Sequence, residues 1–354
     1  MKVLVAMSGG VDSSVASKLL TDAGNDCIGC TMKLYSNEDA GISKGHTCCS
    51  LDDVEDARGV AYRLGMPYYV FNFTEDFREK VIGKFVDSYL QGRTPNPCID
   101  CNRYMKFDKL FDRARILGCD HVATGHYARI DFADGKYLLK KALDPSKDQS
   151  YVLYSMTQEQ LAHTLFPLGE LCKTETRRIA EESGFLNARK PDSQDICFVP
   201  DGNYAKVIER QTGKAPEEGI FTDLCGNVLG HHRGVIHYTV GQHKGLGMPF
   251  PEKMYVCRIL PDTNTVVLGK NEDLFAKEAM VGEVHWISGE RPENPVSCRA
   301  KVRYRQAEQP AVAYPQEDGS VRLVFEEAQR AITPGQAAVL YDGDVVLGGG
   351  TIFA

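Results

Sequence analysis

Residues 1–14 read MKVLVAMSGGVDSS, an apolar run that breaks into a glycine turn and then into a helical pattern. Residues 2–7 have the nearly continuous apolar character of a buried strand. From Val11 onward an apolar residue recurs at every fourth position, until Gly24 ends the pattern. The apolar run is short and no small-residue cleavage site follows it, so we interpret it as the first strand of a sheet and not as a signal peptide.

Strand-like and helix-like segments alternate from this motif to about residue 125. Such alternation is typical of an α/β fold, in which helices cover both faces of a parallel sheet. Ligands of these sheets bind at the carboxyl ends of the strands, where polar loops follow Met7, Leu34 and Thr124. The further strands are expected at residues 27–34, 68–73 and 121–124, and the helices at 52–64, 77–89 and 107–117.

Beyond residue 125 the sequence changes character twice. Asp134-Gly135 predicts a hairpin turn, and helices are expected near residues 157–165 and 174–182. Glycine is dense between residues 226 and 247, and the last part of the chain has the short strands of a small antiparallel barrel. We expect a parallel-sheet catalytic domain over residues 1–200, a small central linking domain over 201–275 and a C-terminal β-barrel over 276–354.

The composition excludes several classes of protein. Of the 354 residues 43% are hydrophobic and 25% charged, which is ordinary for a globular chain, and no long uncharged apolar run predicts a membrane span. Because no secretory signal is evident, the 12 cysteines indicate reduced thiols in the cytoplasm, for chemistry or metal binding, and not a disulfide framework. The net charge of −7 provides no overall attraction for nucleic acid, so RNA binding would require local basic patches.

The loop Ser8-Gly9-Gly10-Val11-Asp12-Ser13 has the features of a phosphate-binding turn. Glycines allow the backbone to approach a ligand closely, and the N–H groups at the start of a helix attract an anion. A Walker loop carries Lys before its Ser or Thr, whereas this loop has Asp12, which could hold Mg²⁺ on the phosphates of ATP. The loop thus resembles the PP-loop of the ATP pyrophosphatases, which cleave ATP between the α- and β-phosphates. The alternative is a glycine turn that only connects the strand to the helix.

Two cysteines that lie far apart in the sequence are candidate catalytic residues. Cys101 lies in residues 94–102, TPNPCIDCN, which we predict to be a loop because the two prolines are incompatible with a regular helix. Basic neighbours of Cys101, among them Arg103 and Lys106, are expected to lower the pKa of its thiol. Together with Cys197 it forms a pair in which one thiol carries sulfane sulfur and the other resolves it.

The spacing Cys98-x-x-Cys101 leaves a second possibility open. It suits Zn²⁺ or an iron–sulfur cluster, and Cys197 would be a third thiolate, so that one iron of a [4Fe–4S] cluster stays open to bind sulfur. No metal is assigned with certainty, and the sequence leaves persulfide and cluster as alternatives. Cys48 and Cys49 receive no functional assignment.

With these motifs assembled, the chain resembles the tRNA-specific 2-thiouridylases (the MnmA/TrmU family) nearly from end to end. The order of the motifs makes the resemblance specific, because the PP-loop alone would leave the reaction open. The motifs are SGGVDSS at 8–14, GRTPNP at 92–97, CN at 101–102, ATGHY at 123–127, KDQSY at 147–151, ICF at 196–198, GQHKGLG at 241–247, RYRQ at 303–306 and TPGQ at 333–336.

The resemblance implies a reaction, its cofactor and its partners. ATP with Mg²⁺ adenylates O2 of the wobble uridine of a tRNA, a persulfide on Cys197 supplies sulfur with Cys101 as partnering nucleophile, and 2-thiouridine, AMP and pyrophosphate result. The sulfur comes from a donor such as a cysteine desulfurase or a sulfur-relay protein. Implied ATP contacts are Ala6, Met7, Ser8, Gly9, Gly10, Val11, Asp12, Ser13, Met32 and Gly125. Implied tRNA contacts are Asn96, Pro97, Cys98, His126, Lys147, Asp148, Gln149, Arg303, Tyr304 and Gln336.

One position departs from the family pattern. Some members carry Asp, with a general acid–base role, where this chain has Cys98, and an ordinary thiol does not take over that role at neutral pH. Either the role is dispensable, or Asp100 substitutes for it, or Cys98 is a ligand or a sulfur relay.

The C-terminal part of the sequence supplies candidate phosphate contacts. On a strand over residues 299–305, Arg299, Lys301, Arg303 and Arg305 would share one face and form a basic stripe. A solvated face of the barrel is the alternative for this stripe.

Two rival functions fit parts of the sequence. Another PP-loop enzyme, an amidotransferase or ligase, would use ammonia and would not need Cys101 or Cys197. A metal- or cluster-bearing RNA-binding protein would leave the ATP loop idle.

Overall fold

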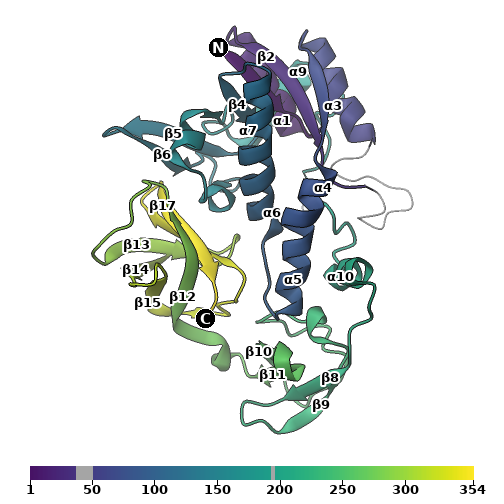
Figure 1. The fold of residues 1–354 in the computed structure, drawn as a ribbon, viewed down its shortest axis with the longest axis vertical. Coiled ribbons are helices and arrows are strands. Elements are labelled where there is room, and N and C mark those ends of the chain that lie inside the picture. Colours follow the sequence, from purple (N-terminus) through teal and green to yellow (C-terminus); the bar gives the residue numbers. More distant parts are fainter. Residues whose placement is uncertain (37–50, 193–195) are drawn as a thin grey trace.

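The computed structural model describes residues 1–36, 51–192 and 196–354. Within these residues the strands form three sheets, of five, four and eight strands. Figure 1 shows the N-terminal sheet with its helices at the top, the barrel of the last strands beside them and a small central unit below. The expected fold class, a parallel-sheet domain followed by a small central domain and an antiparallel barrel, is confirmed.

The N-terminal sheet is entirely parallel in the strand pairs that define it. Ala6, the last residue of β1, is in register with Cys30 of β2 and with Thr124, the last residue of β4. The polar loops after β1 and β4 therefore start at one edge of the sheet. In the order β3-β2-β1-β4-β7 the strands are β3 (Tyr68–Asn72), β2 (Asp26–Lys33), β1 (Lys2–Ala6), β4 (His121–Thr124) and β7 (Thr164–Leu165).

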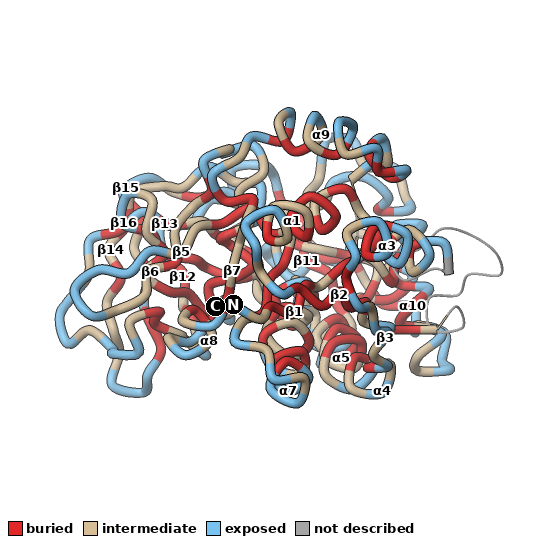
Figure 2. The backbone as a smooth tube through the Cα atoms, turned by 90° about the horizontal axis from the view of Figure 1, so that it is seen from above, coloured by how far each residue is buried: buried red, intermediate tan, exposed pale blue. Residues whose placement is uncertain are grey.

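Helices cover both faces of this sheet (Figure 2). Val3 and Val5 pack with one set of helices and Leu4 with the other, as the alternation of side chains along a strand requires. Each of these side chains is fully buried, which stabilises the fold by about 1.5–3 kcal/mol per residue. The first face carries α1 (Val11–Asp22), α3 (Leu51–Arg63) and α9 (Lys173–Glu182). The second carries two long helical segments, α4 (Thr74–Phe77), η1 (Arg78–Gly83) and α5 (Lys84–Leu90), then α6 (Pro97–Asp100), η2 (Cys101–Lys109) and α7 (Leu110–Ile116).

The expected loop over residues 94–102 is wrong from Pro97 onward. Pro97 occupies the first turn of α6, where a missing N–H costs no hydrogen bond, and the Asn96 side chain caps the helix by accepting from the Cys98 N–H at 3.2 Å. Cys98 and Cys101 therefore lie on a helix and not on a loop. The π-helical segment η2 begins at Cys101, and such distortions are frequent at functional sites.

The Asp134-Gly135 hairpin is confirmed, with both residues at positive φ, 53° and 77°. It connects β5 (Ala128–Ala133) to β6 (Lys136–Lys141), and β6 pairs with β17 of the barrel through Lys140 and Val345. The hairpin thus belongs to the first part of the chain but extends the sheet of the last part. The short helices η3 (Ser150–Leu153) and α8 (Gln158–Ala162) follow it.

The central unit is a small sheet with one helix, α10 (Tyr204–Thr212), before it. Phe221, Val256, Val266 and Leu268 are fully buried in its core. In the order β10-β11-β8-β9 its strands are β10 (Tyr255–Leu260), β11 (Thr265–Gly269), β8 (Gly219–Thr222) and β9 (Val228–His232). Its short helical turns are η4 (Val235–His237), η5 (Pro261–Thr263) and η6 (Glu272–Leu274).

The C-terminal strands close into an antiparallel barrel, because β12 pairs with β15 on one side and with β17 on the other. In the order β12-β15-β14-β13-β16-β17 they are β12 (Phe275–Trp286), β15 (Val321–Arg330), β14 (Gln309–Pro315), β13 (Val296–Lys301), β16 (Ala337–Asp342) and β17 (Val345–Ile352).

The expected basic stripe is wrong, because β13 ends at Lys301. Arg303 lies beyond the strand and turns inward, where Nη2 donates to the carbonyls of Val240 and Ala331 and to Oγ1 of Thr333, at 3.0, 3.0 and 2.7 Å. The Arg303 guanidinium thus connects the barrel to the central unit through three hydrogen bonds, and it does not lie on a strand face with Arg299 and Lys301. Below we call this contact the Arg303 joint.

The described helices contain no segment that is both long enough and apolar enough to cross a membrane.

Candidate functional site

The glycine loop lies between β1 and α1 and is closed by its own hydroxyl groups. Ser13 Oγ accepts from the Ser8 N–H at 3.2 Å and donates to the Gly10 carbonyl at 3.0 Å. Gly10 caps α1 with an extended backbone and has no side chain to occupy the first N–H groups of the helix. From the far side Asn187 Nδ2 donates to the Gly9 carbonyl at 2.9 Å. The loop is therefore held rigidly, with a helix start available to an anion.

Gly125, which follows β4, packs directly against this loop. A Cβ at position 125 would lie 2.8 Å from the Asp12 carbonyl carbon and 2.8 Å from the Ser13 nitrogen. Only glycine fits this contact between two backbone segments. Met32 and Ala6 also lie at the carboxyl edge of the sheet, packed against one apolar cluster. The implied ATP contacts therefore come together at one edge.

Replacing Gly125 by alanine is expected to weaken ATP binding at least about tenfold, because the loop must shift to admit the Cβ. Titration calorimetry with ATP measures the effect. Gly59→Ala on α3 is the matched control, because a Cβ there meets nothing within 4 Å and alanine favours a helix. Unchanged ATP affinity of Gly125→Ala would contradict the close packing.

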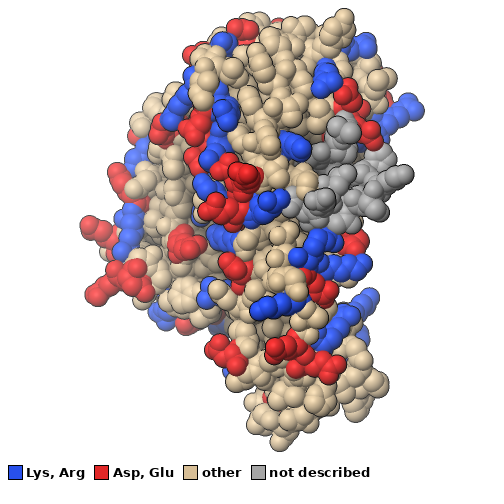
Figure 3. Space-filling view, turned by 45° about the vertical axis from the view of Figure 1, so that its right-hand side comes forward, with Lys and Arg blue, Asp and Glu red and all other residues tan. Residues whose placement is uncertain are grey.

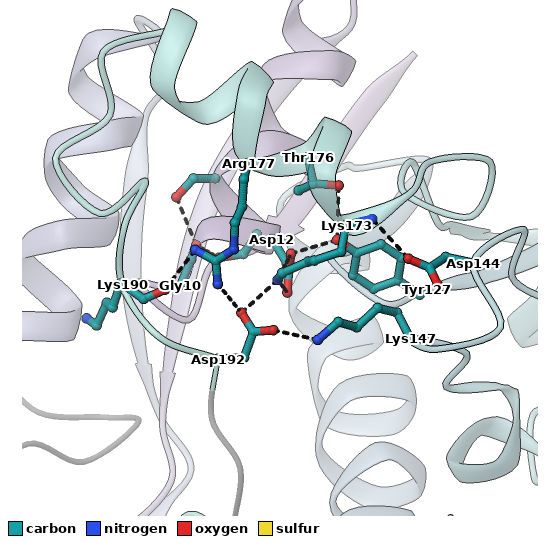
Figure 4. A network of polar contacts seen from close by, with 12 residues as sticks. Gly10, Asp12, Tyr127, Asp144, Lys147, Lys173, Thr176, Arg177, Lys190 and Asp192 are labelled. Atoms are coloured by element: carbon teal, nitrogen blue, oxygen red, sulfur yellow. Dashed lines mark hydrogen bonds and ion pairs between the residues drawn. The ribbon is translucent and has the colours of Figure 1, made fainter.

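Asp12 is contacted by residues that the sequence did not single out. Lys173 Nζ donates to both carboxylate oxygens, at 2.6 and 2.8 Å, and Tyr127 Oη donates to Oδ1 at 2.9 Å (Figure 4). Burial and the charge of Asp12 both raise the pKa of Tyr127, which stays a neutral donor. The loop lacks a Walker lysine, but α9 brings a lysine to it from 161 positions further along the chain.

Lys173 also lies 2.8 Å from Asp192, which Lys147 and Arg177 contact at 2.8 and 2.9 Å (Figure 4). The only signal in the sequence is the spacing of Lys173 and Arg177, which places two cations on one face of a helix. The spacing does not show which part of the chain this face of α9 contacts.

The two candidate cysteines lie at the margin of the same apolar cluster. Cys101 and Cys197 both pack at the margin of an apolar cluster that contains Phe77, Phe85 and Phe198. Tyr35, just beyond β2, donates through its hydroxyl to the Cys197 carbonyl at 2.7 Å and so ties the segment to the carboxyl edge of the sheet. We call this apolar cluster, together with Cys101 and Cys197 at its margin, the cysteine cluster. Cys98 lies one turn of helix before Cys101 and is exposed.

The expected lowering of the Cys101 pKa is wrong. Burial raises the pKa of Cys101 to about 11, although Lys106 acts in the opposite direction. Basic neighbours in the sequence predict a low pKa only if the thiol is also solvated, and here desolvation is the larger effect. Cys101 is thus a thiol and not a thiolate at neutral pH.

Asp100 is buried beside Cys101, and Lys84 Nζ donates to its Oδ1 at 2.8 Å. Burial raises the pKa of Asp100 in spite of this ion pair. A carboxyl group with a raised pKa next to a candidate nucleophile is suited to carry a proton.

Most of the implied tRNA contacts make hydrogen bonds within the protein. His126 is 7% exposed, with Nδ1 at 2.6 Å from Thr124 Oγ1 and Nε2 at 3.3 Å from Lys106 Nζ. Gln149 accepts from the Tyr127 N–H at 2.9 Å, which positions the ring that contacts Asp12. His126 and Gln149 therefore hold other residues of the site in position through internal hydrogen bonds.

The remaining members of the set lie in different settings. Asp148 caps the turn at Ser150, Lys147 pairs with Asp192, and Arg303 forms the joint described above. Gln336 Nε2 donates to the Thr94 carbonyl at 2.7 Å, so the barrel is seated on the segment that leads to Asn96 and Pro97. Tyr304 and Cys98 are exposed.

A cation-rich group surrounds Tyr104 on the helical segment of Cys101. Lys80, Lys84 and Arg103 lie 5.6, 5.9 and 6.0 Å from the centre of the Tyr104 ring. Figure 3 shows Lys and Arg interspersed with Asp and Glu on the face it displays. Phosphate contacts on this face would therefore come from separate basic clusters.

Among residues 1–36, 51–192 and 196–354, no three His, Cys, Asp or Glu side chains are grouped so as to hold a metal ion. Cys98, Cys101 and Cys197 do not form such a group, so in this arrangement they do not fit a three-thiolate cluster. Cys48 and Cys49 lie outside the described residues.

Three family models match consecutive parts of the chain. They are described as the tRNA methyl transferase HUP domain over residues 1–201, the tRNA methyl transferase PRC-barrel domain over 205–270 and the Aminomethyltransferase beta-barrel domain over 276–352. Among solved structures, a 4-thiouridine synthetase–RNA complex with bound ATP is similar over 56% of this chain and 45% of its own, with 22% identity and a TM-score of 0.38.

Full-length relatives are much more similar. The tRNA-specific 2-thiouridylase MnmA of Clostridioides difficile (strain 630) is 53% identical over 353 residues, which is 99% of this chain and 98% of the relative. That of Acetivibrio thermocellus is 52% identical over 355 residues, which covers 99% of each chain. The chain belongs to the family of the tRNA-specific 2-thiouridylases MnmA.

Proposed function

We propose that this chain is an ATP-dependent tRNA 2-thiouridylase, which replaces O2 of the wobble uridine by sulfur. One observation supports the proposal above all. Cys101 and Cys197 pack on one apolar cluster at the carboxyl edge of the sheet, where the loop of residues 8–13 also begins. A loop that adenylates an oxygen, at the same edge of the sheet as two thiols, suits activation of a carbonyl followed by sulfur transfer.

The first step activates a carbon that is otherwise unreactive, because C2 of uridine is a urea-like carbonyl. O2 attacks the α-phosphorus of ATP, the bond between that phosphorus and the oxygen bridging to the β-phosphate breaks, and pyrophosphate leaves. The N–H groups at the start of α1 bind phosphate oxygens, and preorganised donors of this kind favour the charge that develops there.

Asp12 would hold the Mg²⁺ that accompanies ATP. Mg²⁺ in nucleotide sites takes one or two carboxylates together with phosphate oxygens and water, and it neutralises part of the phosphate charge. The Asp12 side chain is 31% exposed although Lys173 and Tyr127 contact it, so it fits this role.

The second step transfers sulfur from a persulfide on Cys197. The terminal sulfur attacks C2, and the C2–O2 bond breaks as AMP leaves. The Cys101 thiol then loses its proton and attacks the Cys197 sulfur, which breaks the S–S bond and leaves sulfur on C2. The product is 2-thiouridine with a Cys101–Cys197 disulfide, which a thiol reductant must reduce before the donor reloads Cys197.

The alkylation of Cys101 is expected to be slow at neutral pH and to rise about tenfold per pH unit up to about pH 10. With a pKa of about 11 the thiolate is about a thousandth of the total at pH 8, against about a tenth for the ordinary value of 9.0. Mass spectrometry of the Cys101 peptide after brief iodoacetamide treatment measures the rate, with the exposed Cys225 as internal reference. Lys106→Gln should slow the reaction further, and equal rates for Cys101 and Cys225 at pH 8 would contradict the raised pKa.

We assign the general acid–base role to Asp100 and not to Cys98, because burial raises the Asp100 pKa and the charge of Asp100 acts on the Cys101 thiol. Asn96, Pro97 and Cys98 then border the target base. Exposed Tyr304 and the cations around Tyr104 contact the tRNA backbone, and the inward-facing His126, Gln149, Arg303 and Gln336 position these groups. Lys147 and Asp148 complete the implied tRNA contacts.

The remaining parts of the proposal concern the surroundings of the enzyme. The sulfur donor is a persulfide-carrying protein, such as a cysteine desulfurase or a relay protein, and the site of action is the cytoplasm, where tRNA is modified. Persulfide transfer is preferred to a cluster because the three cysteines do not group as metal ligands within the described residues. Stoichiometric iron in anaerobically purified protein, with inactivity after its removal, would overturn this preference.

Incubation of the protein with unmodified tRNA, ATP and a persulfide donor tests the proposal. Mass spectrometry of the digested nucleosides should detect 2-thiouridine only when ATP is present. Absence of 2-thiouridine with a competent tRNA would refute the proposed function, and amide formation from ammonia would favour the rival PP-loop ligase.

A further inference from the structure

Lys173 occupies an unusual position for a lysine side chain. It stands in the first turn of α9 with a side chain that is 10% exposed. Nζ lies between two carboxylates, at 2.6 Å from Asp12 Oδ1 and 2.8 Å from Asp192 Oδ1. A nearly buried ammonium needs such partners, because an uncompensated buried charge is strongly destabilising.

Asp192 is the point at which three cations meet (Figure 4). Lys173 and Arg177 contact Oδ1, and Lys147 contacts Oδ2 at 2.8 Å. Burial opposes ionisation of Asp192, but hydrogen bonds from Lys147 and Lys173 outweigh it and lower its pKa. The group is therefore an anion at neutral pH, surrounded by donors.

The cations are fixed relative to the glycine loop by contacts other than Asp192. Arg177 Nη1 donates to the carbonyls of Ala188 and Lys190, at 3.1 and 3.3 Å. Asn187, in the same segment, donates to the Gly9 carbonyl and to Ser14 Oγ, both at 2.9 Å. The segment of residues 187–190 thus contacts both Arg177 and the glycine loop, and it fixes one relative to the other. Lys173 contacts the loop through Asp12.

Carboxylate and phosphate oxygens are bound by the same donors, and a guanidinium fork suits either. A triphosphate that begins at the start of α1 would bring strong negative charge next to Asp12 and Lys173. Asp192 and a phosphate group would compete for the donors of Lys173 and Arg177, because two anions at the same donors repel each other. If phosphates took Lys173 and Arg177 from Asp192, the Asp192 carboxylate would still be paired with Lys147 through Oδ2.

We propose that Lys173 and Arg177 hold the β- and γ-phosphates of ATP, and that Asp192 takes the place of these phosphates when no nucleotide is bound. The inference rests on the proposed function, in which the loop binds ATP. The two cations balance the charge of the pyrophosphate as it leaves the α-phosphorus, and the return of Asp192 to them favours its release.

The inference predicts effects of opposite sign from two partners of one ion pair. Lys173→Gln should weaken ATP binding about tenfold to a hundredfold, since it removes a charged hydrogen-bond donor. Asp192→Asn should strengthen ATP binding about threefold to tenfold, since it removes the competing anion. If the network is only structural, both substitutions should weaken binding.

The choice of ligand separates a phosphate contact from a general disturbance. Titration calorimetry on the full chain should use ATP with Mg²⁺, inorganic pyrophosphate with Mg²⁺, and AMP. Affinities for ATP and pyrophosphate should move in parallel in each variant, and AMP, which lacks the β- and γ-phosphates, should change less than twofold. Lys18→Gln and Asp22→Asn are matched controls, because they form an exposed ion pair on α1, at 2.8 Å, away from the loop.

Two further variants keep the test decisive if Lys173→Gln does not fold. Lys173→Arg retains the charge and should recover part of the affinity, and Arg177→Gln should weaken ATP and pyrophosphate while Asp192→Asn strengthens them. The inference is overturned if Asp192→Asn weakens ATP, or if AMP affinity falls as much as ATP affinity in Lys173→Gln. Failure of the unaltered protein to bind ATP would instead refute the proposed function.

Discussion

Replacement of Cys197 by serine is expected to abolish 2-thiouridine formation while ATP-dependent adenylation of tRNA continues. A serine hydroxyl cannot carry sulfane sulfur, so the loss should be about a thousandfold or more, as for removal of a nucleophile. The adenylation step should persist because it uses the loop of residues 8–13. The Cys197 side chain lies at the margin of the cysteine cluster, and its backbone carbonyl, which holds Tyr35, is retained in the variant.

Two measurements on one sample decide this prediction. Pyrophosphate release reports adenylation, and mass spectrometry of nucleosides reports thiolation. Cys225→Ser is the matched control, since Cys225 is exposed and lies in the turn between β8 and β9 of the central unit. Thiolation at an undiminished rate in Cys197→Ser would exclude a persulfide on this residue, and joint loss of both activities would show that the substitution disturbs the ATP site.

Replacement of Asp12 by asparagine should produce the opposite pattern. Pyrophosphate release is expected to fall about a hundredfold to a thousandfold, the range found when one preorganised electrostatic group is removed. The substitution removes the carboxylate that would hold Mg²⁺ and one of the two anions that flank Lys173. Loading of Cys197 with persulfide by the donor should be unaffected, because it precedes and does not use ATP.

Pyrophosphate release with tRNA and persulfide content of the isolated protein are the two readouts. Tyr127→Phe is a graded control, since it removes the hydrogen bonds of Tyr127 Oη with Asp12 Oδ1, at 2.9 Å, and with Thr176 Oγ1, at 3.0 Å, but keeps the Asp12 carboxylate. It should cost much less than Asp12→Asn. Thermal unfolding of each variant separates a local effect from loss of fold. Pyrophosphate release by Asp12→Asn at the unaltered rate would remove Asp12 from the mechanism.

The substitutions at Cys197 and Asp12 divide the reaction at the adenylated intermediate. Cys197→Ser should accumulate adenylated tRNA, and Asp12→Asn should accumulate persulfide on Cys197. Mixing the two variants should not restore thiolation if both steps occur in one site. Restoration would mean that adenylated tRNA passes between molecules.

Local features of the sequence were sufficient for much of the architecture. The glycine loop after β1, the Asp134-Gly135 turn and the strands after residue 276 carry signals within a few residues, and the structure has all of them. Such signals arise from backbone preference and from the period of apolar residues, which act at short range. The error at Pro97 was also local, since proline in the first turn of a helix and Asn96 before it form a start signal.

Side-chain roles that depend on distant parts of the chain could not be predicted in this way. The sequence predicts that Arg303 belongs to a basic stripe on a strand, but the chain turns after Lys301 and other segments supply three acceptors for its guanidinium. Cys101 was expected to be acidic from its basic neighbours, but tertiary packing desolvates it and raises its pKa to about 11. Burial is a property of the whole fold, and no window of sequence contains it.

The sequence by itself determined that a PP-loop stands after the first strand and that two separated cysteines accompany it. Only the tertiary structure decided that α9 brings Lys173 to Asp12, that Asp192 gathers three cations, and that Cys101 and Cys197 share one apolar cluster. The physical reason is that backbone conformation is set largely by neighbours in the chain. Charge pairing and desolvation are set by neighbours in space, which folding brings together from 161 positions apart in the case of Lys173 and Asp12.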